Sequence, residues 1–338
     1  MDGRLLPVFV KNLGLVEEEF FARELNLRFV NKQIALESGV TLVACTEPQE
    51  WDIFFKAQKP ETVVFFLLGN ETYDVGKYLY FNNIPAIKHV YIYNPPRKNR
   101  LFALGPIMGF LYDCPKAALT KIFYRTLKNS FDFAKRSRNI KLNYPWTEIP
   151  LGYTNRFIQE LTASNLIHPK EKSAFKVERQ DIDLAKKYIG FIGQSGSWVR
   201  KNVLSAVEKS NKLAFNLDSQ WGGSIYRELG DYARDIIDSK VNLVPPGNLT
   251  NQTFRYLECL ILWRLPVTPP ITIQDHHFNR YWTEFDGPRF LCYSYLRLAK
   301  FVTRMKSPKY MELVTRYRLE QQQLLTKIRT QIFKSAYN

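Results

Sequence analysis

The residues best suited to chemistry stand at the start of one expected helix. Arg255 and Glu258 lie one helical turn apart, so their side chains share a face. The free backbone N–H groups of a helix start carry partial positive charge, and Arg255 adds a full charge beside them, which suits a diphosphate. The Glu258 carboxylate can accept hydrogen bonds from two ribose hydroxyls. An ordinary surface ion pair between the two side chains is the alternative.

Two strands and a glycine turn must position this helix. The strand 241–244 precedes it, and a Pro-Pro-Gly turn ends at Gly247. A polar stretch with Asn251 and Thr253 then opens the helix, and a second apolar strand, 265–267, follows it. Strand, glycine turn, polar helix start and strand is the layout of a nucleotide-binding half of an α/β domain.

A second glycine-rich strand end lies upstream, where Gly190-Phe191-Ile192-Gly193 is followed by Arg200. Together with this segment, the run from Val241 to Val267 resembles the exostosin-type glycosyltransferases. Their C-terminal signature is a strand, a Pro-x-Gly turn, a Ser or Thr, an Arg, a Glu and a final Pro-Val. The likeness covers about a third of the chain and is nearest to the ribitol and fucose xylosyltransferases of the exostosin-like type, viral ones included. One departure is Arg264-Leu265, where the family has a glycine, so the sequence does not secure a close turn at this point.

The resemblance implies the GT-B plan, an α/β fold in which two Rossmann-like domains face a central cleft. It places an acceptor-binding domain at residues 1–155, a linker at 156–185, a nucleotide-sugar-binding domain at 186–290, and helices that cross back to the first domain at 291–338. It implies an inverting glycosyltransferase, a hexosyl- or pentosyltransferase that moves a sugar, xylose by the nearest likeness, from a nucleoside-diphosphate sugar such as UDP-xylose to a hydroxyl of a glycan acceptor. No cofactor and no metal are expected. The implied donor-binding residues are Gly193, Arg200, Gly247, Asn251, Thr253, Arg255 and Glu258.

One loop of the first half offers carboxylates directly after an apolar strand. Glu71 and Asp74 follow the strand 63–68, and such a loop faces the ligand at the carboxyl end of a parallel sheet. An inverting transfer needs a carboxylate to remove the proton of the acceptor hydroxyl, so both are candidate general bases, with Glu71 ahead of Asp74. Asp74 also fits a plain helix cap.

Two further polar groups have simpler interpretations. The triplet Asp181-Ile182-Asp183 mimics a D-x-D metal motif, but no strand precedes it, which favours solvated surface. His276 and His277 follow the last expected strand. Adjacent side chains point to different sides of most backbones, so this pair indicates a surface loop rather than a zinc site.

The chain of 338 residues carries a net charge of +16, most of it in residues 116–141 and 297–334. Such charge attracts nucleic acid, anionic lipid head groups or nucleotide diphosphates. No zinc-finger, RNP or homeodomain pattern accompanies it, so nucleic acid is not a predicted partner. Near the C-terminus, apolar residues at helical spacing predict an amphipathic helix, with peripheral membrane contact as the alternative. These residues are Leu313, Tyr317, Leu324, Ile328 and Ile332.

The compartment is predicted from several features. Four scattered cysteines without C-x-x-C or metal spacing indicate free thiols in a reducing compartment. No apolar run reaches the roughly 20 residues of a membrane span, and the first residues do not form a signal peptide. Sequons at Asn248 and Asn251 would place a glycan in the proposed phosphate loop. A soluble, cytoplasmic protein is therefore expected, in the host cytoplasm if it is viral.

Two alternatives in function stay open. A fucosyltransferase of the GT-B plan that uses GDP-fucose shares a related strand-Glu-Pro pattern. A non-catalytic basic protein that binds nucleotides or lipids would use the same helix start and charged faces.

Apolar runs alternate with helix-like stretches in both halves, as in mainly parallel sheets covered by helices. Strands are expected at 5–10, 41–44, 63–68, 89–93, 188–192, 213–216, 241–244 and 265–268. Helices are expected at 17–25, 74–82, 200–210 and 226–239.

Overall fold

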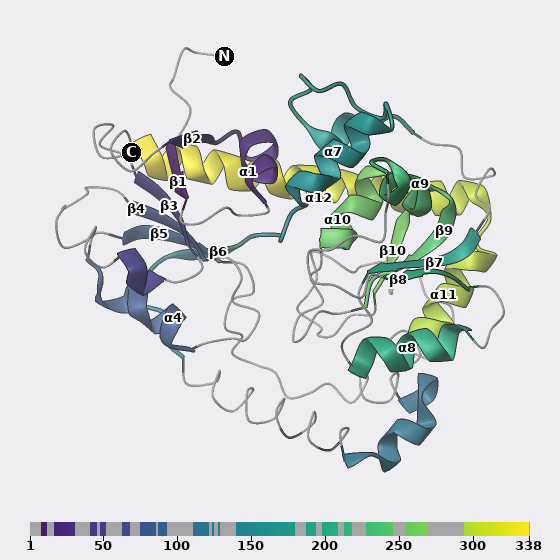
Figure 1. The fold of residues 1–338 in the computed structure, drawn as a ribbon. Helices are drawn as coiled ribbons and strands as arrows, with labels where there is room; N and C mark the ends of the chain where they lie inside the picture. The colour runs from purple at the N-terminus through teal and green to yellow at the C-terminus, as the bar shows by residue number, and fades with distance from the viewer. Residues whose placement is uncertain are drawn as a thin grey trace. The chain divides into compact units, whose positions relative to one another are not determined.

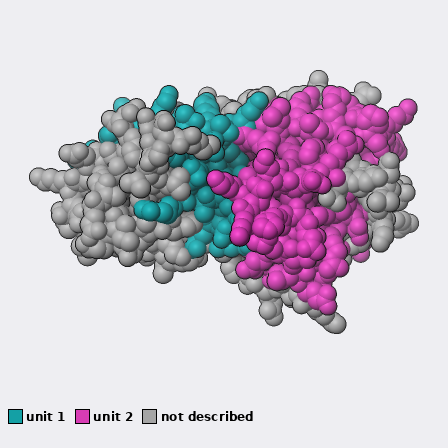
Figure 2. Space-filling view, turned by 90° about the horizontal axis from the view of Figure 1, so that it is seen from above, with its two compact units in different colours: residues 1–98, 136–155, 323–338 teal, residues 99–135, 156–322 magenta. Residues whose placement is uncertain are grey.

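A computed structural model of the chain forms two compact units (Figures 1 and 2). Unit 1 comprises Met1–Lys98, Arg136–Asn155 and Gln323–Asn338, and unit 2 comprises Asn99–Lys135 and Arg156–Gln322. The structure describes residues 8–11, 17–30, 41–45, 48–51, 63–67, 75–85, 87–92, 111–121, 124, 128, 140–179, 187–193, 198–208, 213–217, 228–245, 254–268 and 294–337.

Unit 1 contains a six-stranded sheet in the order β2-β1-β3-β4-β5-β6, with every neighbouring pair parallel. The strands are β1 (Val8–Lys11), β2 (Arg28–Val30), β3 (Thr41–Cys45), β4 (Val63–Leu67), β5 (Ile87–Ile92) and β6 (Trp146–Glu148). The helices of its first segment are α1 (Glu18–Glu24) and α4 (Val75–Tyr80). The four strands and two helices expected here are confirmed, while β2 and β6 were not predicted.

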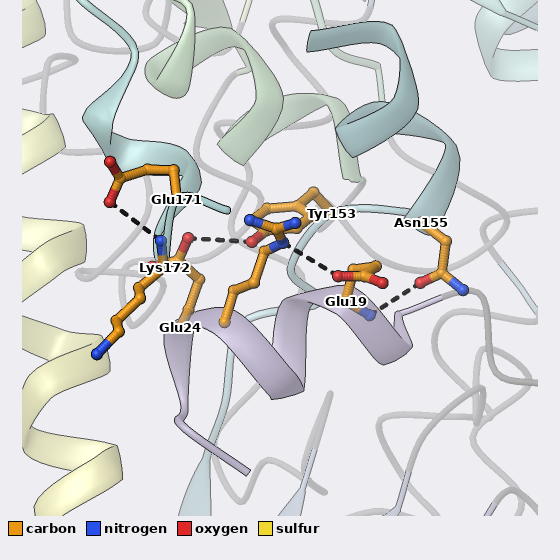
Figure 3. A network of polar contacts seen from close by, with 7 residues as sticks. Glu19, Glu24, Tyr153, Asn155, Glu171 and Lys172 are labelled. Atoms are coloured by element: carbon orange, nitrogen blue, oxygen red, sulfur yellow. Dashed lines mark hydrogen bonds and ion pairs between the residues drawn. The ribbon is translucent and has the colours of Figure 1, made fainter. Parts of the chain in front are cut away.

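The segment after β6 holds helix α1 in place. Gly152 has φ 87°, and a Cβ at this position would lie 2.5 Å from the ring of buried Phe20, so only glycine allows this approach. The hydroxyl of Tyr153 donates to Oε1 of Glu24 at 3.0 Å, and Oδ1 of Asn155 accepts a backbone N–H in the first turn of α1 at 2.9 Å (Figure 3). The segment from Gly152 to Asn155 is therefore a packing surface for α1.

Unit 2 contains a second all-parallel sheet, in the order β10-β9-β7-β8. Its strands are β7 (Lys187–Gly193), β8 (Leu213–Leu217), β9 (Ser239–Leu243) and β10 (Leu265–Val267). Pro266 lies in β10, an edge strand of the described sheet, where a missing N–H is tolerated. Two parallel α/β sheets in one chain confirm the expected fold class.

Helices cover both faces of this second sheet. The unit contains α7 (Asn155–Ala163), α8 (Trp198–Glu208), α9 (Asp231–Ile237), α10 (Phe254–Ile261), α11 (Tyr295–Arg304) and the start of α12 (Ser307–Tyr337). α8 and α11 pack together on one face, and α9 and α10 lie on the other (Figure 1). The expected strands are confirmed, as are the expected helices at 200–210 and 226–239, the latter shorter than predicted.

The turn after α10 closes without a glycine. Trp263 takes the left-handed conformation, with φ 59°, while its N–H bonds to the carbonyl of Leu260 and the N–H of Arg264 to the carbonyl of Cys259. This is the Schellman pattern, in which glycine is the usual left-handed residue. Here the indole compensates for the backbone strain, because its Nε1 donates to the Val177 carbonyl at 2.9 Å.

A buried arginine of α12 binds the same helix end. Arg318 is 4% exposed, and its guanidinium donates to the carbonyls of Leu260 and Ile261 at the end of α10. It also donates to two carbonyls of the preceding segment, those of Phe175 and Val177. Its Cζ lies 4.3 Å from the ring centroid of Trp263. The carboxyl end of a helix carries a partial negative charge, which attracts the guanidinium. These contacts therefore offset the free-energy cost of removing the guanidinium from water.

The long helix α12 is amphipathic, as expected. Leu313, Tyr317, Ile328 and Ile332 are buried. Leu324 is half-buried, and its neighbour Leu325 is buried. Within unit 2 the Tyr310 hydroxyl joins two strands. It accepts the N–H of Leu265 at 2.9 Å and donates to the carbonyl of Lys240 at 2.5 Å. From Gln323 onward the helix belongs to unit 1.

We expect Arg318→Ala to lower the free energy of unfolding of unit 2 by about 3 kcal/mol or more, because four buried carbonyls lose a charged donor. Arg318→Lys should cost less, since it keeps the charge but not the planar fork. Denaturant unfolding measures both. Exposed Arg304→Ala in α11 is the control, with an expected change within about 0.5 kcal/mol. Equal effects at both positions would contradict the role of Arg318.

Candidate functional site

The two glycine-containing segments found in the sequence are neighbours in unit 2. β7 and β9 run parallel and adjacent, with Gly190 paired to Asn242. A Cβ on Gly190 would lie 2.3 Å from Oγ of Ser239, so glycine permits this close approach. The chain passes from β7 to β8 on one side and then returns across β7 to β9, so the strand order reverses between β7 and β9. Ligands of open α/β sheets bind beyond the carboxyl ends of the strands at such a point.

Arg255 stands at this edge, as the second residue of α10. Its Cζ lies 5.6 Å from the ring centroid of Phe191 in β7, so the guanidinium reaches back over the neighbouring strand. Its Nε is buried and has no hydrogen-bond partner among the residues that the structure describes. An unsatisfied buried N–H of a charged group is costly, and a bound anion is one way to satisfy it.

Glu258 lies one turn further along α10 and is 3% exposed. The alternative of a surface ion pair is therefore wrong for this carboxylate. Its Oε2 accepts a hydrogen bond from the hydroxyl of Tyr232 in α9. Burial and the adjacent Glu258 charge raise the pKa of Tyr232 well above its usual value of 10, so the phenol remains a donor. A carboxylate has about four lone-pair sites, so this bond does not exhaust its capacity to accept.

A second buried carboxylate holds the start of α9, and with it Tyr232. Glu160 of α7 is fully buried, and its Oε2 accepts the N–H of Gly230 at 2.5 Å. Gly230 precedes α9 with φ 101°, and Oγ of Ser164 donates to its carbonyl at 3.3 Å. The ring of Phe157 meets that of Tyr232 edge to face, with centroids 6.4 Å apart. Helix α7 lies within the stretch expected as a linker, yet these contacts pack it against α9.

On the other face of the sheet, Arg200 lies in the first turn of α8, half-buried. Its charge acts on the hydroxyl of Tyr295, the first residue of α11, which lies beside Thr268 at the end of β10. Burial, the largest influence, raises the pKa of this phenol well above its usual value. The starts of α8, α10 and α11 therefore bring Arg200, Arg255 and Tyr295 to the same edge of the sheet.

An aspartate from the segment 111–113 binds the start of α11. The Oδ1 of Asp113 accepts from the hydroxyl of Ser294 at 2.5 Å, and Oδ2 accepts the N–H of Tyr295 at 2.7 Å. Ser294 itself caps the helix by accepting the N–H of Arg297. Burial raises the pKa of Asp113 to about 6, although these hydrogen bonds work in the opposite direction.

The structure places four of the expected site residues. Gly193 ends β7, Arg200 lies in α8, and Arg255 and Glu258 lie in α10. The other expected site residues, and the two polar groups interpreted as surface, lie outside the described residues. These are Glu71, Asp74, Gly247, Asn251, Thr253, His276, His277, Asp181 and Asp183. The role of each expected residue in donor binding or catalysis stays a prediction.

In the described part of the chain, no three His, Cys, Asp or Glu residues come together in a way that could hold a metal ion. Among the same residues, no helix combines the length and the apolar character that crossing a membrane requires.

Comparison with known proteins gives a structural likeness but no match in sequence. No protein-family model matches the sequence, and no curated protein matches it. The chain is similar to a solved alpha1,3-fucosyltransferase, with a TM-score of 0.48 and 12% sequence identity over 99% of this chain and 92% of the other. Because the TM-score is below 0.5 at this identity, function has to be argued from the residues themselves.

Sequence reasoning missed Tyr232, Glu160 and Asp113. None belongs to a motif, and each reaches its partner from another element far away along the chain. The only signal near Tyr232 is Gly230, which marks a helix start without saying what the helix packs against.

The Asp113 site predicts a pH dependence of stability. A carboxyl group whose pKa is raised from 3.8 to about 6 on folding stabilises the protein below pH 4, and this contribution is lost as the pH rises through 6. Asp113→Asn can keep both hydrogen bonds, since its amide can donate to Ser294, and it removes the titration. The unfolding free energy of the wild type relative to this variant should fall by on the order of 2–3 kcal/mol between pH 4 and 7.

Denaturant unfolding across this pH range measures the difference. Glu312→Gln, at an exposed carboxylate, corrects for the general effect of removing a negative charge. A difference between the wild type and Asp113→Asn that stays constant with pH would show that Asp113 does not titrate in this range.

Proposed function

We propose that the chain is an inverting glycosyltransferase of the GT-B plan, in which unit 2 binds a nucleoside-diphosphate sugar and unit 1 binds a glycan acceptor. One observation carries this proposal: the Nε of Arg255 is buried without a hydrogen-bond partner among the described residues. It lies at the strand-order reversal of unit 2, one helical turn from buried Glu258. A guanidinium and a carboxylate at this spacing match the two ends of a ribose diphosphate, which offers phosphate oxygens to one and hydroxyl donors to the other.

Each group has a defined part in the proposed reaction. The bond between the anomeric carbon of the donor and the diphosphate oxygen breaks, and the acceptor hydroxyl oxygen bonds to that carbon from the opposite side. The hydroxyl proton passes to a carboxylate, for which Glu71 is the first candidate and Asp74 the second. Negative charge grows on the leaving diphosphate, and Arg255 with the start of α10 stabilises it electrostatically. Arg200, in the first turn of α8, is a second source of positive charge at this edge.

Tyr232 is proposed to position Glu258. Its hydroxyl donates to Oε2 of Glu258. A carboxylate can accept several hydrogen bonds, so the ribose hydroxyls are proposed to donate to the same group. Xylose is the proposed sugar and UDP-xylose the proposed donor, on the strength of the sequence resemblance. GDP-fucose is the competing donor, because the same diphosphate site serves either nucleotide and only the base and sugar contacts differ.

We expect UDP-xylose and UDP to raise the melting temperature of the protein, because a ligand that binds only the folded state stabilises it by mass action. Arg255→Ala should weaken this binding by at least tenfold, and Glu258→Gln by about tenfold, each through the loss of a charge-assisted hydrogen bond. Thermal shift followed by calorimetry measures both effects. Arg234→Ala removes an arginine of α9 that is 60% exposed, and it is the matched control.

The outcomes separate the candidate functions. Stabilisation by guanine nucleotides alone would replace UDP-xylose with GDP-fucose as the donor. Nucleotide binding without transfer to any acceptor, and without hydrolysis of the sugar, would indicate a non-catalytic nucleotide-binding protein. An absence of nucleotide binding, or a loss as large in Arg234→Ala as in Arg255→Ala, would reject the site.

We expect Glu71→Gln to lower kcat by at least a hundredfold while donor affinity stays unchanged, since a general base acts in the chemical step and not in donor binding. Asp74→Asn is the matched comparison: it should lower stability rather than turnover if Asp74 is only a helix cap, and it should lower kcat instead of Glu71→Gln if Asp74 is the base. Transfer assays under donor saturation measure kcat. Unchanged turnover in Glu71→Gln would exclude this carboxylate as the base.

A further inference from the structure

A strongly basic segment that begins in unit 2 and ends in unit 1 takes no part in the proposed donor site. Between Lys116 and Lys141 the sequence has eight Lys or Arg residues and a single acidic one, Asp132, for a net charge of +7. The same run contains four aromatic residues. Basic and aromatic residues mixed in this way are typical of segments that lie at a membrane surface.

The described side chains of this segment combine exposed apolar and exposed basic groups. Leu119 is 86% exposed and Tyr124 is 64% exposed, the highest values among the large apolar side chains that the structure describes. Lys116, Lys121 and Lys128 are exposed as well. We call these five residues the lysine-rich surface. An ordinary amphipathic helix would bury its apolar side chains against the core, but Leu119 and Tyr124 are exposed beside the lysines.

Part of this surface follows helical spacing. The N–H of Tyr124 bonds to the carbonyl of Thr120. Lys121, Tyr124 and Lys128 are each helical and are separated by three and then four positions, a spacing at which helical side chains share a face. This arrangement suits a ring at the level of lipid head groups, with ammonium groups that reach the phosphates.

Tyr112 and Asp113, which precede the lysine-rich surface in the chain, are hydrogen-bonded to the first turn of α11 and to its cap residue. Besides the contacts of Asp113, the hydroxyl of Tyr112 accepts a hydrogen bond from Nε of Arg297 at 2.6 Å. The Cζ of Arg297 also lies 4.9 Å from the ring centroid of Tyr112. The lysine-rich surface therefore projects from a fixed point of unit 2. Figure 1 shows this segment, in blue, beyond α8 at the margin of the unit.

Charge and chemistry favour one kind of partner. A second copy of the chain would place one cluster of lysines against another, and like charges oppose such an interface. Nucleic acid would use the lysines and Tyr124 but would gain nothing from Leu119, which has no base-stacking face. An anionic bilayer uses all of them, because its surface attracts each lysine and its interface accepts leucine and tyrosine.

We propose that the lysine-rich surface binds the surface of a bilayer that contains anionic lipid. This binding is peripheral and independent of the donor site, so it holds or fails whether or not the chain transfers a sugar. It also assigns membrane contact to this segment rather than to the basic C-terminal helix.

Sedimentation of the full chain with vesicles tests the proposal. Vesicles of phosphatidylcholine with about 30% phosphatidylserine should bind it, and those of pure phosphatidylcholine should not, because each lysine near an anionic surface contributes about 1 kcal/mol. The triple variant Lys116→Gln, Lys121→Gln, Lys128→Gln should lose about a hundredfold in partition coefficient by the same estimate. The double variant Leu119→Ser, Tyr124→Ser should lose at least tenfold.

Matched controls come from exposed positions in the C-terminal region. Lys306→Gln, Lys327→Gln and Lys334→Gln remove the same charge from the other basic stretch, and Leu319→Ser removes a leucine that is 51% exposed. These controls should keep full vesicle binding, and all variants should keep the melting temperature of the wild type because the changed side chains are exposed.

Several results would overturn the proposal. Equal binding to neutral and anionic vesicles, or a loss only in the C-terminal control, would remove the lysine-rich surface as the lipid contact. Salt-sensitive binding of RNA or DNA that the triple variant loses, without any vesicle binding, would make it a nucleic-acid surface. A dimer that the Leu119→Ser, Tyr124→Ser variant abolishes, again without vesicle binding, would make it a contact between copies.

Discussion

The placement of α10 depends on one buried guanidinium. Arg318 is bound to the last carbonyls of α10 and to the segment at residues 175–177, so it fixes the helix from its carboxyl end. Four backbone carbonyls and two aromatic rings contact its guanidinium and stabilise the positive charge. With that end fixed, the opposite end of α10 lies at the carboxyl edge of the sheet, and Arg255 and Glu258 lie there with it. Trp263 makes the same arrangement possible by closing the turn into β10.

A second set of buried polar contacts orients the carboxylate. Glu160 binds the start of α9, α9 carries Tyr232, and the Tyr232 hydroxyl holds Glu258. Each step pairs a buried acceptor with a donor, as a low-dielectric interior demands. One end of the expected linker region, α7, thereby takes part in shaping the candidate site. Glu258 is thus held by tertiary contacts rather than by its own helix alone.

The fold could be predicted further than the site. Strands such as β4 and β7 can be predicted from the sequence because five or more residues form a continuous apolar run. In contrast, β2 and β6 have three residues each, and their register is set by neighbouring strands. Arg255 and Glu258 could be predicted from spacing, since one helical turn is a local property. The burial of Glu258 could not, because α9 provides it from a distance. The turn at Trp263 could not be predicted from the sequence either, because the left-handed conformation of this tryptophan depends on its hydrogen bond to the Val177 carbonyl.

Helix α10 also contains its own chemical reporter. Cys259 follows Glu258 directly, is fully buried, and carries a free thiol whose pKa is raised, first by burial and then by the neighbouring carboxylate. A protonated, inaccessible thiol does not react with alkylating reagents until the surrounding structure opens. The rate at which Cys259 becomes labelled therefore measures how often α10 detaches from the sheet. Half-buried Cys114, in the segment that leads to the lysine-rich surface, gives an internal reference in the same protein.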